Sequence, residues 1–151
     1  MSAHTTRDIL DQARLFHQQM HAFYAALQGR IEQPKLQLIL DYLCQHEDRM
    51  AAALQAYERR AAEGVLSAWF QFTPGVSVES ALSALPADGT LSLDDLMRIA
   101  TLLENELIRL YRRAADEAVS ENVKTVFERL LEEAVKDRTR LAHVLGDMQD
   151  L

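Results

Sequence analysis

Apolar residues recur at helical spacing along four long stretches of this sequence, and that periodicity restricts the fold more than any other feature. In the first stretch, from Thr6 to about Gly29, they form the single buried face of an amphipathic helix. The apolar positions are Ile9, Leu10, Ala13, Phe16, Met20, Phe23, Tyr24 and Leu27. Thr5 and Asp8 resemble a capping box, in which the hydroxyl accepts a hydrogen bond from an open amide. A helix is therefore predicted to follow Thr5.

The same reasoning predicts three further helices. Pro34 begins the second, which runs to about residue 62, because a missing N–H costs nothing in the first turn. Ser92 begins the third, which runs to about residue 119. Ser120 begins the fourth, which ends near residue 146. All four are long enough to cross a small domain.

The two halves of the chain share a pattern at a constant offset of 87 residues. Caps, aromatic residues and core leucines coincide under this offset without a gap, although few other residues are identical. The matching pairs are Thr5 with Ser92, Asp8 with Asp95, Ala13 with Ala100, Tyr24 with Tyr111, Leu43 with Leu130, and Leu54 with Leu141. The pattern favours an ancient duplication, although a shared bundle pattern without common descent would also produce it.

Connection lengths then predict the architecture. Short turns join the helices within each half, over about residues 6–63 and 92–148, and short turns make sequential helices antiparallel neighbours. The irregular segment 64–91 is long enough to cross the length of the bundle, with room for one short helix. The expected fold is all-α: a four-helix bundle of two hairpins and one long crossover, forming a single domain over residues 1–151.

Composition and charge exclude several classes of function. Sixteen basic against 23 acidic residues give a net charge of −7, whereas a nucleic-acid partner would require a clustered basic face. No apolar run approaches membrane-spanning length, and the opening MSAHTTRDIL lacks a signal-peptide pattern. With Cys44 as the single cysteine, no internal disulfide can form. The expected location is the cytoplasm, without a membrane or nucleic-acid partner.

Four segments carry a recognisable motif. They are HQQMHAFYAAL (17–27) with LCQHEDRM (43–50), and ENELIRLYRRA (104–114) with LLEEAVKD (130–137). This arrangement resembles rubrerythrin-type domains of the ferritin-like superfamily, in which each half carries a glutamate before an aromatic residue on one helix and Glu-x-x-His on the next. The resemblance covers all four long helices and implies a ferritin-like bundle with a metal site between them.

The resemblance also implies which residues would hold the metals. The six ligand positions fall on His17, Glu47, Met50, Glu104, Ala134 and Asp137. Glu47 and Glu104 keep the expected identity, whereas Met50 is a soft donor and Ala134 has none to offer. A conventional diiron centre is therefore not expected, and neither are the iron storage, peroxide reduction and oxygen activation that depend on one.

Three interpretations of the remaining polar residues stay open. In the first, they form a hydrogen-bonded cluster without a cofactor, with Met50 and Ala134 filling the space of former ligands. In the second, a single divalent iron, manganese or zinc ion is bound by one imidazole and three carboxylates, namely His17, Glu47, Glu104 and Asp137. In the third, His17, His21 and His46 join Glu47 in the first half alone.

Three aromatic residues lie in the crossover rather than on a periodic helix face: Trp69, Phe70 and Phe72. They are expected to fold down over one end or side of the bundle. The alternative is an exposed apolar patch that completes a homodimer.

The sequence favours a non-catalytic helical protein that associates with itself or with a protein partner. No catalytic residue is assigned. The main expectation is that the protein binds no cofactor. The alternative is a metal-binding protein, or a rubrerythrin-like oxidoreductase or iron-handling protein with altered ligands.

Overall fold

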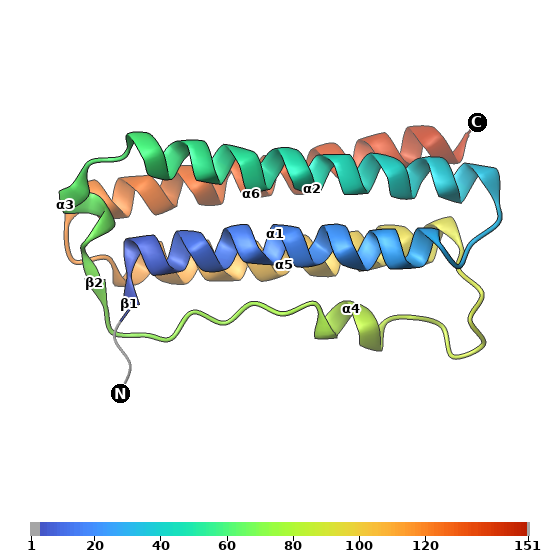
Figure 1. Ribbon diagram of the computed structural model, residues 1–151, viewed down its shortest axis with the longest axis horizontal. Helices are drawn as coiled ribbons and strands as arrows, with labels where there is room; N and C mark the ends of the chain where they lie inside the picture. The colour runs from blue at the N-terminus through green and yellow to red at the C-terminus, as the bar shows by residue number, and fades with distance from the viewer. Residues whose placement is uncertain (1–3, 151) are drawn as a thin grey trace.

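Four long helices form a bundle in the computed structural model, which describes residues 4–150. They are α1 (Thr6–Gln28), α2 (Pro34–Arg60), α5 (Leu93–Glu117) and α6 (Glu121–Gln149). Figure 1 shows α2 and α6 in one layer and α1 and α5 in the other. Contacts are densest within the α1–α2 and α5–α6 hairpins, as the short turns predicted. The all-α bundle with one long crossover is confirmed.

The helices begin where local chemistry places them. Thr5 and Asp8 form a complete capping box before α1, and Ser92 and Asp95 form another before α5. Pro34 occupies the first turn of α2, where no backbone partner is required of it. The predicted starts are thus confirmed. Only α6 differs appreciably from expectation, because it continues past Gly146 to Gln149.

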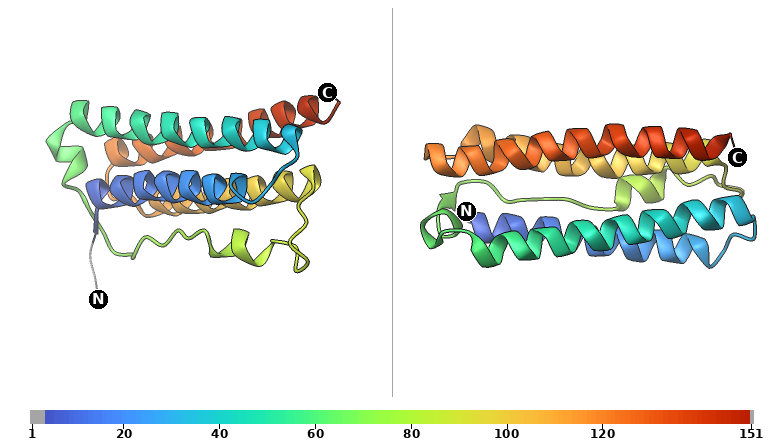
Figure 2. Two further views of the ribbon diagram at one scale, coloured as in Figure 1. Left: turned by 45° about the vertical axis from the view of Figure 1, so that its right-hand side comes forward. Right: turned by 90° about the horizontal axis from the view of Figure 1, so that it is seen from above.

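The crossover contains more structure than the single short helix expected. It comprises α3 (Glu63–Leu66), strand β2 (Trp69–Phe70) and α4 (Glu79–Ser83), and it returns along the outside of the α1–α5 layer (Figures 1 and 2). Strand β2 pairs antiparallel with β1 (His4–Thr5), which fixes the crossover to the start of α1.

The crossover aromatics divide between the two predicted roles. Phe70 and Phe72 are buried, and the Phe70 ring lies edge-on to Phe127 of α6 at 5.6 Å between centroids. Trp69 is 60% exposed because neighbouring residues of a strand point to opposite sides. The covering role is therefore confirmed for two of the three residues, whereas Trp69 is exposed.

Apolar side chains from all four long helices fill the core, but its middle is polar. The buried polar or charged residues on these helices are Thr6, His17, His46, Glu47, Glu104 and Asp137. Within residues 4–150, no helix combines the length and apolar character needed to cross a membrane. An ordinary bundle core contains few ionisable groups, so this polar layer requires a specific explanation.

Candidate metal site

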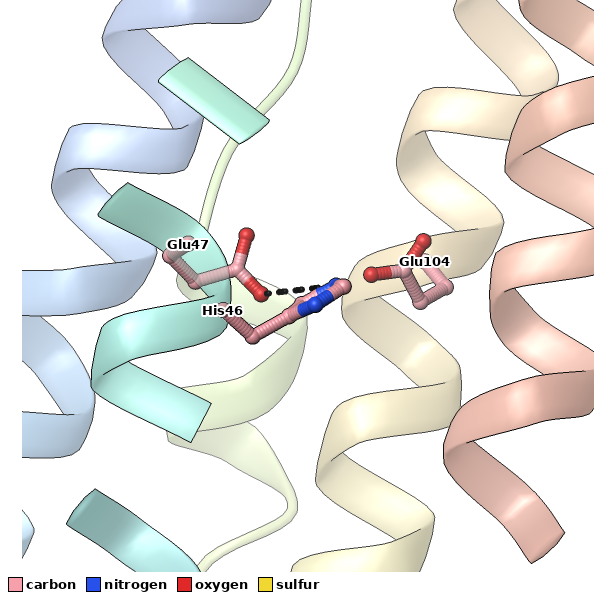
Figure 3. Close-up of side chains that lie close together, drawn as sticks. All are labelled: His46, Glu47 and Glu104. Atoms are coloured by element: carbon pink, nitrogen blue, oxygen red, sulfur yellow. Dashed lines mark ion pairs between the residues drawn. The ribbon is translucent and has the colours of Figure 1, made fainter. Parts of the chain in front are cut away.

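Each of the four long helices contributes to one buried polar cluster. His17 comes from α1, His46 and Glu47 from α2, Glu104 from α5 and Asp137 from α6. Each of these five residues is at most 6% exposed. Figure 3 shows His46 and Glu47 projecting from α2 toward Glu104 on α5. The structure thus brings together all four residues predicted from sequence, and it adds His46.

Two short contacts organise the cluster. Nδ1 of His17 lies 2.6 Å from Oε1 of Glu47, and Nε2 of His46 lies 2.8 Å from Oδ2 of Asp137. Because a carboxylate can only accept a hydrogen bond, each ring nitrogen must carry the shared proton when its partner is ionised. His17 thereby fixes the orientation of Glu47. His46 links the two hairpins through α2 and α6.

Each carboxylate keeps one buried oxygen unpaired. Oε2 of Glu47, Oε2 of Glu104 and Oδ1 of Asp137 have no hydrogen-bond partner among the protein atoms of residues 4–150. The nearest cation to Asp137 Oδ1 is the Arg140 guanidinium, at 3.7 Å, which is too long for a good hydrogen bond. Buried acceptors are normally satisfied, so three such oxygens in one cluster point to a missing positive partner.

Burial and mutual repulsion make the cluster a strong proton acceptor. Burial raises the pKa of Glu104 well above its ordinary value, and the charges of Glu47 and Asp137 and a hydrogen bond shared with Asp137 add to the rise. Burial lowers the pKa of His46, but its hydrogen bond to Asp137 and the nearby carboxylate charges outweigh that effect and raise it overall. Protons therefore neutralise the cluster when no metal does so.

The donor atoms are close enough to share one ion. His46, Glu47 and Glu104 each offer one ligand atom, and these atoms lie within 4.8 Å of one another. Two donors on opposite sides of one transition metal are about 4.2 Å apart, so a small inward movement would bring all three into range. Asp137 touches the same His46 nitrogen and could supply a fourth donor. The residues present therefore fit a single metal ion.

The histidine trio predicted as a third possibility is not assembled. His21 lies away from the cluster, where its Nδ1 is 3.0 Å from Oδ1 of Asp48 and 3.2 Å from the backbone oxygen of Cys44. Its side chain is 39% exposed. His17 and His46 contribute separately to the cluster, each facing a different carboxylate.

Two tyrosines lie beside the carboxylates, at the equivalent positions seen in sequence. Burial raises the pKa of Tyr24 well above its ordinary value, and Glu47 and Glu104 raise it further. Burial and the charge of Glu104 likewise raise the pKa of Tyr111. Both phenols therefore stay protonated at neutral pH and serve as neutral, largely apolar walls of the site.

Met50 and Ala134, which the resemblance placed at ligand positions, do not fill the space beside the cluster. They line a cavity of about 270 Å³ together with His17, Glu104 and Asp137. The expectation that they occupy the volume of former ligands stays a prediction. A methionine and an alanine offer no hard donor, and the room left beside them remains open.

The fold is shared with a solved protein. The sequence matches no protein-family model and no curated protein. The structure, in contrast, superimposes on the crystal structure of a Thermotoga maritima protein described as a ferritin-like diiron-carboxylate protein, with a TM-score of 0.63 and 15% sequence identity over 97% of each chain. At this identity the likeness concerns the fold alone. By its helix arrangement, its crossover and this structural match, the chain has the ferritin-like fold.

Proposed function

We propose that this protein binds a single divalent transition-metal ion through His46, Glu47 and Glu104. Asp137 supplies the fourth donor, and His17 acts outside the coordination shell by holding Glu47 in place through its Nδ1–H. The observation that carries the proposal is the set of three buried carboxylate oxygens without a partner, one on each of Glu47, Glu104 and Asp137. A cation bound among these three oxygens would give each of them a partner.

One ion suits this donor set better than two. A dinuclear carboxylate site requires an imidazole and bridging carboxylates for each metal, and positions 50 and 134 hold Met and Ala instead. Nε2 of His46 and Oδ2 of Asp137, two of the proposed ligand atoms, already lie 2.8 Å apart, so little rearrangement is needed to bring them onto one ion. The ligand types admit iron, manganese or zinc.

Metal binding must displace protons. The raised pKa of Glu104 means that this carboxyl holds a proton when the metal is absent, and a second proton lies between His46 and Asp137. A divalent ion replaces both, so binding should release about two protons and strengthen as the pH rises. A bound iron or manganese ion would supply one-electron redox chemistry, and zinc would supply a Lewis acid.

Elemental analysis by plasma mass spectrometry tests the proposal directly. Untagged protein is stripped with chelator, incubated separately with iron, manganese or zinc, and desalted. About one metal per chain is expected for the parent and almost none for Glu47→Ala with Glu104→Ala. The matched control is Glu128→Ala with Glu132→Ala, which removes two exposed carboxylates from α6. Equal metal in the two double variants, or none in the parent, would refute a cluster-bound ion.

A metal-free helical scaffold is the second candidate, and one observation favours it. The two histidines already pair with two of the carboxylates, at 2.6 and 2.8 Å, and a proton on Glu104 neutralises the third. In that case the cluster serves stability and the protein acts through its surface. The absence of metal from the reconstituted parent would support this candidate.

Self-association belongs to the same second candidate. Trp69 offers an exposed indole in the crossover, and an exposed large aromatic side chain is a common anchor of interfaces. Light scattering over a wide concentration range should show a dimer that Trp69→Ser converts to a monomer. A parent protein that is monomeric throughout would contradict self-association.

A further inference from the structure

The cavity beside the cluster has a polar end and an apolar body. Its apolar lining side chains are Met50, Ala53, Leu54, Leu107, Leu130 and Ala134. On α2 the lining residues run from Met50 to Arg60, and on α6 they run from Asp137 back to Leu130. His46 of α2 meets Asp137 of α6, so both runs lead away from the polar cluster toward the end of the bundle that holds α3 (Figure 1).

The polar end of the cavity presents buried acceptors without donors. Glu104 and Asp137 both line the cavity, and these residues are only 2% and 6% exposed. Oε2 of Glu104 and Oδ1 of Asp137 have no hydrogen-bond partner among the protein atoms of residues 4–150. A molecule that enters the cavity therefore meets two buried oxygens that need hydrogen-bond donors.

The charges along the lining favour a cation at the polar end. Arg60 marks the far end, where its guanidinium lies 5.4 Å from the centroid of the Tyr57 ring, and it repels a cation there. Arg140 lies near the polar end, with its guanidinium 3.7 Å from Oδ1 of Asp137, but its side chain is 62% exposed. An exposed ion pair of this length is weak, so Arg140 can turn toward solvent at little cost.

The volume limits the size of an occupant. About 270 Å³ corresponds to roughly nine water molecules at about 30 Å³ each, and lies just below the range of pockets for drug-sized ligands. An occupant of about ten non-hydrogen atoms fits this space. Long-chain lipids exceed it.

We propose that this cavity binds a primary alkyl amine of about eight carbon atoms as its ammonium ion. The ammonium group donates hydrogen bonds to Oε2 of Glu104 and Oδ1 of Asp137, and the alkyl chain lies against Met50, Leu54 and Leu130. The metal is not required for this binding. Because the proposed metal ion uses the same two carboxyl groups, the amine and the metal exclude each other.

The unpaired oxygens select a primary amine over other amphiphiles of similar size. An ammonium group carries three N–H donors and a positive charge, which the two oxygens lack among the protein atoms of residues 4–150. A trimethylammonium group has the same charge but no N–H donor. An alcohol has one donor and no charge, and a carboxylate is repelled by the carboxyl groups already present.

Calorimetry with four probes of similar chain length tests the proposal: octylamine, octyltrimethylammonium, 1-octanol and sodium octanoate. In the presence of chelator, the protein should bind octylamine about tenfold more tightly than octanol or octyltrimethylammonium, because hydrogen bonds between charged groups are the strong ones. Octanoate should bind weakest.

Variants of the polar end test the head-group contacts. Glu104→Gln with Asp137→Asn keeps the side-chain shapes and should weaken octylamine about tenfold while leaving octanol unchanged. The matched control, Glu128→Gln with Glu132→Gln, removes the same charge from exposed positions of α6 outside the cavity and should change neither. Arg140→Gln removes a competing cation and should strengthen octylamine about threefold. This single change keeps the test valid if the double variant fails to fold.

A further variant tests the location. Ala134→Leu places three carbons inside the cavity and should weaken octylamine and octanol together, with folding checked by circular dichroism. Ala52→Leu adds the same carbons at an exposed position of α2 outside the cavity and should leave both unchanged.

Three results would overturn the proposal. They are no octylamine binding at millimolar concentration, octanol or octyltrimethylammonium binding as tightly as octylamine, and parent-like octylamine binding by the Glu104 and Asp137 variant. Metal content is measured separately by plasma mass spectrometry. Octylamine binding by a protein that takes up no metal would leave this proposal standing while refuting the metal site. If the parent does take up metal, saturating octylamine should lower that uptake, and unchanged uptake would overturn the shared position.

Discussion

Replacing Glu104 with glutamine should remove a pH dependence of stability from the metal-free protein. The pKa of Glu104 is raised well above its ordinary value of 4.5 by burial and by the neighbouring carboxylates. The folded chain therefore keeps a proton that the unfolded chain releases. The stability linked to this proton is fully present below about pH 4.5 and is lost as the pH rises toward the raised pKa.

The size of the effect follows from linkage. While Glu104 is protonated in the folded chain and ionised in the unfolded chain, each pH unit lowers the free energy of unfolding by about 1.4 kcal/mol. The loss continues until Glu104 ionises in the folded chain, so a larger rise of its pKa gives a larger total loss of stability. Glutamine keeps the shape of the neutral side chain and donates to Asp137 without carrying a titratable proton.

Urea unfolding followed by circular dichroism, in chelator at pH 5, 6, 7 and 8, measures this slope. The parent should become less stable as the pH rises, and Glu104→Gln should lose about 1.4 kcal/mol less per pH unit than the parent over the pH range in which Glu104 stays protonated in the folded chain. Glu58→Gln is the matched control, because burial and a hydrogen bond with Asp11 raise the pKa of Glu58 to about 7 at a separate place. The two changes should add. Equal slopes for the parent and Glu104→Gln would refute a proton held on Glu104.

Three further outcomes are expected. Adding zinc or manganese in slight excess should raise the melting temperature more at pH 8 than at pH 5 in differential scanning calorimetry, because the donors must lose protons to bind. Phe127→Ala should cost about 3–5 kcal/mol in urea unfolding, because this ring is fully buried against Phe70 and Tyr111. Met50→His with Ala134→Glu restores two donors and should raise metal content from about one ion per chain toward two, measured by plasma mass spectrometry.

The helix starts could be predicted because capping is local. Thr5 with Asp8, and Ser92 with Asp95, satisfy open amides within one turn, so their residue types and spacing carry the whole signal. The short elements α3 and α4 lack that signal, because neither begins with a side-chain cap. Their conformation depends on packing against the finished bundle, which a single sequence does not encode locally.

From sequence alone, His46 is grouped with His17, His21 and Glu47, and not with Glu104 and Asp137. His46 and Glu47 are adjacent, so their side chains leave α2 about 100° apart, and a simple amphipathic face has room for one of them. In the bundle, buried side chains of α2 face two other helices, α1 and α6. Glu47 faces His17 of α1, and His46 faces Asp137 of α6. Both side chains point into the bundle only because the second hairpin packs beside α2. The periodicity of apolar residues along α2 alone does not reveal where that hairpin lies.

The cavity lies beside two of the positions at which the resemblance places metal ligands. A dinuclear site fills its centre with two ions and the donors that surround them. In this chain Met50 carries a flexible thioether and Ala134 ends at Cβ, and both side chains line the cavity. The cavity meets the polar cluster at His17, Glu104 and Asp137. Any change in the volume of this cavity would therefore act beside the proposed metal site.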